Sequence, residues 1–281
     1  MKHKLLSLYG LKWDPFTAGV PTEALYRTPA IEQFCWRVEH STLRDGGFAM
    51  ISGDPGTGKS VALRLLAEQL KNLTDVNVGV ISMPSARLPD FYREMGDIFN
   101  VELNPHNRWR GFKTLRERWL AHMQGTLMRP IMLIDEAQEV PPGVLNELRL
   151  LSSIEFDSGN LLSVVMVGDQ RLKEKLRQDD LLPLGSRIRA RLNMEHASVD
   201  ELKACLKHLI SRAGNPSLMT EQLILTMCEH ALGNYRVLIG MAAELLTTAV
   251  QQELTELDEK LYLQCFAVQQ KISAPRKRRG G

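Results

Sequence analysis

One eight-residue stretch constrains this chain more than any other, and it reads Gly53-Asp54-Pro55-Gly56-Thr57-Gly58-Lys59-Ser60. It fits the pattern G-x-x-x-x-G-K-[ST] of a phosphate loop, which joins a buried strand to a helix. The sequence indicates both the strand and the helix, because an apolar run fills residues 47–52 and apolar residues recur at helical spacing over 60–70. The alternative is a glycine-rich turn before an ordinary helix, which this context disfavours. The sequence therefore predicts a binding site for a nucleoside triphosphate.

The residue types of this loop explain how it would hold phosphate. Glycines let backbone N–H groups converge on phosphate oxygens without Cβ clashes, and the start of a helix adds unpaired donors. We expect Lys59 to contact the β- and γ-phosphates and the Ser60 hydroxyl to coordinate Mg²⁺. The predicted nucleotide-binding residues are the loop and the first turn of the helix, namely Gly53, Asp54, Pro55, Gly56, Thr57, Gly58, Lys59, Ser60 and Val61.

The composition is that of an ordinary soluble protein. The 281 residues are enough for one large or two modest domains, with 44% hydrophobic and 24% charged residues. No apolar run approaches the roughly 18 residues that a membrane helix requires, and the N-terminus lacks a signal-peptide pattern. The 4 cysteines form no C-x-x-C pair, which argues against structural zinc and a disulfide framework. We expect a cytoplasmic protein without a membrane partner.

Apolar strands alternate with helical patterns after residue 46, which is typical of a parallel α/β sheet. The predicted strands are 47–52, 76–81, 130–134 and 161–167, and 186–192 is either a short helix or the run into a final strand. The predicted helices are 29–43, 60–70, 88–99, 112–124, 142–153 and 172–177, followed by 198–213, 220–232, 235–252 and 257–270. Four parts result: an N-terminal segment and helix (1–46), an α/β nucleotide-binding domain (47–196), a small helical domain (197–272) and a basic tail (273–281).

A second element for nucleotide chemistry is the hydrophobic strand that ends in Asp135 and Glu136. We expect this strand to lie beside the phosphate-loop strand and to direct its C-terminal acids toward the γ-phosphate and Mg²⁺. Asp135 would help to hold the metal, and Glu136 would polarise the attacking water as a general base. The alternative is a strand that ends in a polar turn, which is disfavoured beside a phosphate loop. ATP hydrolysis is the predicted reaction.

The tail carries the basic charge of the chain. Its run Arg276-Lys277-Arg278-Arg279 contributes four positive charges, so the net +2 of the whole chain leaves −2 for residues 1–275. Such a tail cannot bury a core, and we expect it to be disordered. Two interpretations remain open: it holds nucleic-acid phosphates or an acidic partner, or it is a solvated end that aids solubility.

Taken together, these motifs resemble those of AAA+ ATPases, specifically the group with the ExeA/GspA secretion ATPases and the transposition helpers TniB, TnsC, MuB and IstB. Three stretches carry the closer resemblance: Leu8-Tyr9-Gly10-Leu11-Lys12-Trp13-Asp14-Pro15-Phe16, Gly47-Phe48-Ala49-Met50-Ile51-Ser52-Gly53 and Val167-Gly168-Asp169-Gln170-Arg171-Leu172. The similarity extends over about residues 5–255. It implies the AAA+ fold, a parallel sheet sandwiched by helices and followed by an all-α lid, with ATP and Mg²⁺ as ligands.

The resemblance also implies roles for further residues. Asp169 or Gln170 would sense the γ-phosphate, although many family members have Asn or Thr there. Arg187, with Arg189 as second choice, would reach a neighbouring subunit's nucleotide in trans; the alternative is a run of surface arginines. Arg236, in the stretch Gly233-Asn234-Tyr235-Arg236, would act as a second sensor and contact the phosphates.

A basic cluster with interleaved tryptophans lies where related oligomeric ATPases present elements that face DNA. Its cations are Arg108, Arg110, Lys113, Arg116 and Arg118, against the single acid Glu117, with Trp109 and Trp119 between them. We take Arg108, Arg110 and Lys113 as candidate contacts to the phosphates of duplex DNA. The alternative is a solvated helix face with tryptophan packed in the core. No motif for base-specific readout is found.

The resemblance yields three functional hypotheses. The first is an ATP-dependent regulator of transposition that assembles into a ring or helical filament on duplex target DNA, recruits a transposase, is stimulated by it and disassembles on hydrolysis. The second is an ExeA/GspA-like ATPase of secretion or envelope assembly that acts through a membrane partner. The third, a nucleotide-gated scaffold without turnover, is disfavoured by Glu136.

Overall fold

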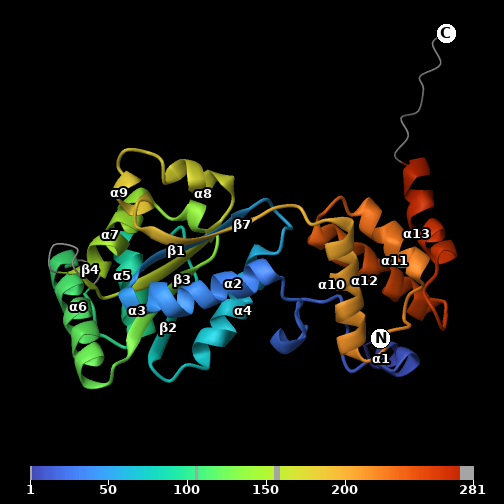
Figure 1. Cartoon of the computed structure of the whole chain (residues 1–281), viewed down its shortest axis with the longest axis horizontal. Helices are drawn as coiled ribbons and strands as arrows, with labels where there is room; N and C mark the ends of the chain where they lie inside the picture. Colours follow the sequence, from blue (N-terminus) through green and yellow to red (C-terminus); the bar gives the residue numbers. More distant parts are fainter. Residues whose placement is uncertain (1, 105–106, 155–158, 273–281) are drawn as a thin grey trace, which may run out of the picture. The chain divides into compact units, whose positions relative to one another are not determined.

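A computed structural model describes residues 2–104, 107–154 and 159–272 (Figure 1). By its internal contacts the chain divides into two units: Arg27–Glu195, and a second unit formed by the residues up to Tyr26 together with those from His196 onward. The predicted N-terminal segment 1–46 is thus split between the two units. The predicted basic tail, 273–281, lies outside the described residues.

The larger unit is built on a five-stranded sheet in which every pairing is parallel. Its strands are β1 (Gly47–Gly53), β2 (Val76–Ile81), β3 (Arg129–Ile134), β6 (Ser163–Gly168) and β7 (Ile188–Met194). The predicted parallel α/β class is therefore confirmed. The ambiguous stretch 186–192 belongs mostly to a strand, because alternate residues of β7 are buried and exposed, as at the edge of a sheet.

The lateral order of the strands corrects one expectation. The sheet runs β2-β3-β6-β1-β7, so β3 does not lie beside the phosphate-loop strand β1. Strand β6 lies between them and pairs with both, Ile131 of β3 and Gly47 of β1 each being opposite Ser163. The sequence does not show this order because a crossover can carry the chain past one or more strand positions before it re-enters the sheet, as the connection from β1 to β2 does.

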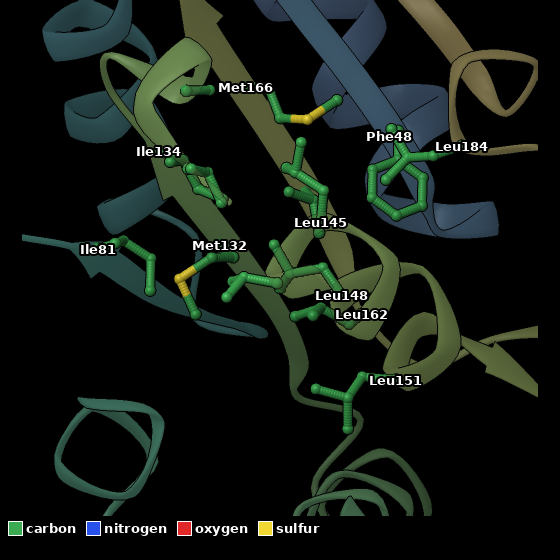
Figure 2. Packing of buried hydrophobic residues seen from close by; sticks show 14 of the residues in the cluster. Phe48, Ile81, Met132, Ile134, Leu145, Leu148, Leu151, Leu162, Met166 and Leu184 are labelled. Atoms are coloured by element: carbon green, nitrogen blue, oxygen red, sulfur yellow. The ribbon is translucent and has the colours of Figure 1, made fainter. Parts of the chain in front are cut away.

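Helices cover both faces of this sheet. One face packs against α5 (Leu88–Phe99), α6 (Arg108–Gly125), α7 (Pro142–Ser152) and α8 (Gln170–Lys175), and α2 (Pro29–Arg37) and α4 (Lys59–Lys71) cover the other (Figure 1). Strand alternation decides which side chains face which layer. Met132 and Ile134 of β3 meet Leu145 and Leu148 of α7 in the core that Figure 2 shows.

Short elements complete this unit. They are the π-helix η2 (Val38–Thr42), α3 (Leu43–Asp45), the 3-10 helix η3 (Ala137–Glu139), α9 (Leu182–Gly185) and an antiparallel pair of two-residue strands, β4 (Ser153–Ile154) and β5 (Gly159–Asn160). Of these, η3 follows β3 directly and therefore shapes the surroundings of Glu136.

The smaller unit is all helical. Its helices are α1 (Lys2–Tyr9), the 3-10 turn η1 (Thr22–Ala24), α10 (Val199–Ala213), α11 (Glu221–His230), α12 (Tyr235–Gln251) and α13 (Glu259–Ile272). Side chains cap three of the helix starts: Ser198 caps α10, Thr220 caps α11 and Asn234 caps α12. Among the helices that the structure describes, none combines the length and apolar character needed to cross a bilayer.

The first residues of the chain are part of the core of the helical unit. Leu5, Tyr9, Leu11 and Phe16 are buried in one cluster with residues of α10, α11 and α12. The Lys12 amide also donates to the Ala213 carbonyl at 2.8 Å, and the Tyr9 hydroxyl donates to the Leu254 carbonyl at 2.8 Å. This packing is the physical reason why the N-terminal segment divides at residue 26 and does not form one piece with helix α2.

We predict that Leu11→Ala destabilises the helical unit by about 2–5 kcal/mol, because it removes buried side-chain volume. Leu263→Ala is the matched control, since Leu263 is 61% exposed and Leu11 only 6%; its effect should stay within about 0.5 kcal/mol. Hydrogen exchange of α10–α12, together with urea unfolding followed by circular dichroism, measures both. Equal effects of the two substitutions would contradict the proposed packing of the N-terminal segment.

Candidate nucleotide-binding site

The phosphate loop has the backbone that its glycines allow. It connects the end of β1 to the start of α4, and Gly56 and Gly58 adopt φ of +85° and +96°, a region that side chains disfavour. At Gly53 a Cβ atom would lie 2.3 Å from the carbonyl oxygen of Met194 on the neighbouring strand β7. These three glycines are therefore required by the shape of the loop and by the close approach of β7.

The loop is braced by its own side chains. The buried Thr57 donates its hydroxyl to the Asp54 carbonyl at 2.8 Å, and the Lys59 ammonium donates to the same carbonyl at 2.9 Å. The Lys59 side chain thus folds back toward the loop, and its ammonium group contacts the loop backbone. Ser60 and Val61 lie exposed in the first turn of α4.

The N-terminus of α4 suits an anion. Gly58 occupies the N-cap position, and no side chain caps this helix. In a helix of 13 residues the first amides carry the positive end of the helix dipole, and here Lys59 adds a full positive charge beside them. The residues present therefore fit a phosphate group, with the glycine backbone as its cradle.

The two acids stand at the same edge of the sheet as this loop. In β6, Met166 lies opposite Ile134 of β3, and Gly168 lies opposite Ser52 of β1. Strands are spaced about 4.8 Å apart, so the ends of β1 and β3 are separated by roughly 10 Å. That separation leaves room for a triphosphate between the loop and the acids.

Asp135 and Glu136 differ in their surroundings. Asp135 is half-buried and accepts a hydrogen bond from the Glu136 amide at 3.0 Å, whereas the Glu136 side chain is exposed. Within the described residues no group of three or more metal-ligating side chains exists. Ser60 and Asp135 are the residues that would hold a magnesium ion, and their oxygen donors suit a metal that takes few protein ligands.

The sensor candidates lie at the end of β6, between the loop and the acids. Asp169 caps α8, accepts from the Arg171 amide at 2.9 Å and pairs with the Arg171 guanidinium at 2.8 Å. Arg171 also pairs with Glu139 at 3.0 Å. Gln170 is exposed at the start of α8. The Asp169 carboxylate is thus already engaged by Arg171, a partner that the sequence analysis missed although the Asp-x-Arg spacing after a strand signals it.

Opposing influences act on the pKa of Asp169. Burial raises this pKa, but hydrogen bonds from Arg171 and the positive charges of Arg171 and Lys59 outweigh it, and the net pKa is lowered. The influence of Lys59 indicates that the end of β6 and the phosphate loop share one electrostatic environment.

The two arginines considered for a trans role lie at the opposite end of the sheet from the phosphate loop. Ile188, between them, is opposite Phe48, whereas Met194 is opposite Gly53. Six residues of extended strand span about 20 Å, so neither side chain reaches the loop of its own subunit. Arg187 is half-buried, and Arg189 pairs with Asp45 at 3.4 Å.

Arg236, the second-sensor candidate, belongs to the helical unit. It is exposed in the first turn of α12, where the Asn234 side chain accepts a hydrogen bond from the Arg236 backbone amide at 2.9 Å. Gly233, at φ +79°, lets the preceding turn lie against Ala197, whose carbonyl oxygen would be 2.8 Å from a Cβ.

Two of the five cations predicted as a DNA-facing cluster contact residues of α7. Arg108 forms a forked pair with Glu147 at 3.0 and 3.1 Å, and Glu147 is only 1% exposed. Arg116 donates to the carbonyl of Leu150 at 3.1 Å, near the end of α7. Burial lowers the pKa of Arg116, whereas the Glu147 hydrogen bond raises that of Arg108.

The two tryptophans of α6 lie in different surroundings, one as expected for a DNA-facing cluster and the other as expected for a solvated helix face with tryptophan in the core. Trp119 is buried in the core, as the solvated-face alternative requires, but Trp109 is 73% exposed. Lys113 lies 5.5 Å from the centre of the Trp109 ring and pairs with Glu117 at 3.7 Å. Arg110 and Arg118 are exposed beside them. The exposed residues of α6 thus include Trp109, Arg110, Lys113 and Arg118, together with the acid Glu117.

Comparison with known proteins agrees with this geometry. The AAA domain family matches residues 42–176, which include the phosphate loop, the two acids and the sensor strand. Residues 42–176 are an AAA domain. The resemblance to AAA+ ATPases that the motifs indicate is thereby confirmed. General secretion pathway protein A of Aeromonas hydrophila is 32% identical over 209 residues, which are 73% of this chain and 37% of that protein. The chain therefore spans little more than a third of this relative's length.

Solved structures of AAA+ proteins share the fold. Cdc6p from Pyrobaculum aerophilum matches with a TM-score of 0.68 at 18% identity, over 93% of this chain and 74% of its own. A structure of Drosophila ORC bound to DNA matches with a TM-score of 0.69 at 15% identity, over 97% and 69%. At these identities the likeness concerns the fold alone.

We predict that Asp169→Asn destabilises the AAA domain at neutral pH by about 1 kcal/mol, because the amide still caps α8 but loses the charge that pairs with Arg171. The lowered pKa means that the ionised form stabilises the fold above the ordinary value of 3.8, and that this contribution is lost as the pH falls through the lowered pKa.

Urea unfolding followed by tryptophan fluorescence, to which the buried Trp119 contributes, tests this prediction. The difference between wild type and Asp169→Asn should shrink at pH values well below 3.8. Asp179→Asn, at an exposed position beyond α8, is the control and should change little at any pH. A difference that stays constant across the acid range would contradict the assigned role of the ion pair.

Proposed function

We propose that this chain binds ATP with Mg²⁺ and hydrolyses the γ-phosphate bond. The observation that carries the proposal is the alignment of three strand ends at one edge of the sheet. The phosphate loop follows β1, the acids follow β3, and the sensor candidates follow β6, which lies between them. A nucleotide on the loop would extend its γ-phosphate toward the acids.

The roles follow from the chemistry of the side chains. Lys59 and the first amides of α4 bind the β- and γ-phosphates, while Ser60 and Asp135 hold the magnesium ion. Glu136 accepts a proton from the attacking water, because its exposed carboxylate stands at the end of β3 beside the metal ligand. Asp169 or Gln170 reports on the γ-phosphate from the end of β6.

We further propose that subunits associate and complete each other's site. Arg187, with Arg189 as second choice, would neutralise transition-state charge on the nucleotide of a neighbouring subunit. Support comes from their place at the far end of β7, roughly 20 Å from the loop of their own subunit. Arg236 would contact the phosphates from the helical unit. A ring or a helical filament would satisfy both requirements.

The partner we propose for this assembly is duplex DNA, and the process it serves is transposition, with a transposase as the protein that stimulates hydrolysis. The exposed face of α6 supports the DNA contact, as does the likeness to an ORC structure bound to DNA. Arg110 and Lys113 are the preferred contacts, because Arg108 is committed to Glu147. The proposal of a transposase as partner rests on the motif resemblance. The cysteine pattern favours a cytoplasmic location.

A second candidate function is favoured by one specific observation. General secretion pathway protein A is 32% identical over 73% of this chain. An ATPase of secretion or envelope assembly would use the same nucleotide site but would act through a membrane partner in place of DNA.

We predict that Glu136→Gln binds ATP about as tightly as wild type but hydrolyses it at least roughly a hundredfold more slowly, because the amide cannot accept the water proton. Lys59→Ala should lose ATP binding itself, since it removes the charge beside the phosphate loop. Binding of a fluorescent ATP analogue and steady-state phosphate release separate the two effects. Unimpaired ATP hydrolysis by Glu136→Gln would show that Glu136 is not the general base.

We also predict that the double variant Arg110→Gln/Lys113→Gln weakens ATP-dependent co-sedimentation with plasmid DNA by about tenfold or more and reduces its salt slope by about two. Arg177→Gln/Lys71→Gln is the control, because it removes the same charge from exposed positions outside α6.

The same assay separates the two candidate functions. Equal losses of DNA co-sedimentation in both double variants would show that DNA binding depends on net charge alone and not on the α6 surface. A wild-type protein that never sediments with DNA would exclude the DNA proposal and favour the secretion function.

A further inference from the structure

Gln138 occupies an unusual place in the candidate site. It is buried, with 6% exposure, although it lies only two residues after the exposed Glu136. Its side-chain amide donates to the Glu136 carboxylate. Its side-chain oxygen accepts from the backbone amide of Asp169 at 3.3 Å. One side chain therefore joins the end of β3 to the end of β6.

The backbone around Gln138 is shaped for this contact. Glu136 adopts φ of +51°, which turns the chain into η3 and brings Gln138 back toward the carboxylate. Lys175 of α8 donates its ammonium to the carbonyls of Gln138 and Val140, the latter at 2.9 Å. The turn is thus held by a helix that follows the sensor strand.

Gly168 provides the space that Gln138 occupies. A Cβ atom at this position would lie only 2.5 Å from the Gln138 side-chain oxygen. The φ of Gly168 is not in the left-handed region, so backbone conformation does not demand glycine here. Leu172 of α8 also comes within 2.9 Å of this Cβ position, so the close approach of the Gln138 and Leu172 side chains together accounts for the absence of a side chain at the last residue of β6.

We propose that Gln138 is a positioning residue for ATP hydrolysis, which orients the Glu136 carboxylate and couples it to the sensor end of β6. This inference rests on the proposed role of Glu136. A carboxamide suits the position because it offers a donor to the carboxylate and an acceptor to the Asp169 amide at once. With one Glu136 oxygen held by Gln138, the other is presented to the attacking water. A displacement of the backbone at the end of β6 would be transmitted to Glu136 through this single side chain, because the Asp169 amide donates to Gln138.

The test is a double-mutant cycle on the full chain. Gln138→Leu keeps a similar volume but cannot form either hydrogen bond; we expect kcat to fall about tenfold to a hundredfold with KM for ATP and the affinity for a fluorescent ATP analogue nearly unchanged. In the Glu136→Gln background the same substitution should cause almost no further loss, because it acts through Glu136.

Gly168→Ala provides an independent variant. Its methyl group would displace the Gln138 side chain and would also press on Leu172. We expect the same selective fall in kcat, and adding Leu172→Ala, which relieves the contact with the Leu172 Cδ2 atom, should not restore it. Gly143→Ala is the control, since a Cβ there meets nothing within 4 Å. Thermal unfolding of every variant separates lost positioning from lost folding, and Gly168→Ala keeps the inference testable if Gln138→Leu does not fold.

The outcomes are distinct. Unchanged kcat in Gln138→Leu and Gly168→Ala, or losses that simply multiply with that of Glu136→Gln, would overturn the positioning role while leaving the proposed ATPase intact. Wild-type protein that binds ATP but releases no phosphate would instead refute the proposed function, and the inference with it.

Discussion

The parallel pairing of β1, β6 and β3 is the interaction on which the rest of this structure depends. Its register aligns the carboxyl ends of the three strands, so that residues distant in sequence meet at one edge of the sheet. Strand β6 is buried along its whole length, and it separates the phosphate loop from the acids by two strand spacings, roughly 10 Å. A slip of one residue in either pairing would reverse the faces of a strand and move its terminal residue away from this edge.

The sequence predicted those parts of the site that are encoded locally. The phosphate loop and the acidic strand end are continuous motifs, and the burial of their strands follows from apolar runs. The expectation that β3 lies beside β1 was wrong, because the lateral order of strands depends on crossovers that no local pattern specifies. The packing of the N-terminal segment is likewise not encoded locally: Leu11 and Phe16 pack into helices far later in the chain, and local spacing carries no sign of that.

The roles of the charged residues are also only partly predictable from the sequence. The sequence displays five cations around α6, but it does not show that the buried Glu147, 39 positions after Arg108, requires one of them. The hydroxyl of the buried Tyr92 also donates to Glu147, and burial together with that carboxylate raises the pKa of Tyr92. A buried carboxylate that lost these partners would be strongly destabilising, so part of the basic cluster serves the fold. Among the described residues of the cluster, Trp109, Arg110, Lys113 and Arg118 stay exposed without a contact to Glu147.

We propose that the edge formed by β1, β6 and β3 is a single nucleotide site. A structure of the chain with Mg²⁺ and a non-hydrolysable ATP analogue tests this claim most directly. We expect the γ-phosphate to lie between Lys59 and Glu136, with the metal ion on the Ser60 hydroxyl. An analogue bound elsewhere, or one whose γ-phosphate points away from the end of β3, would contradict it.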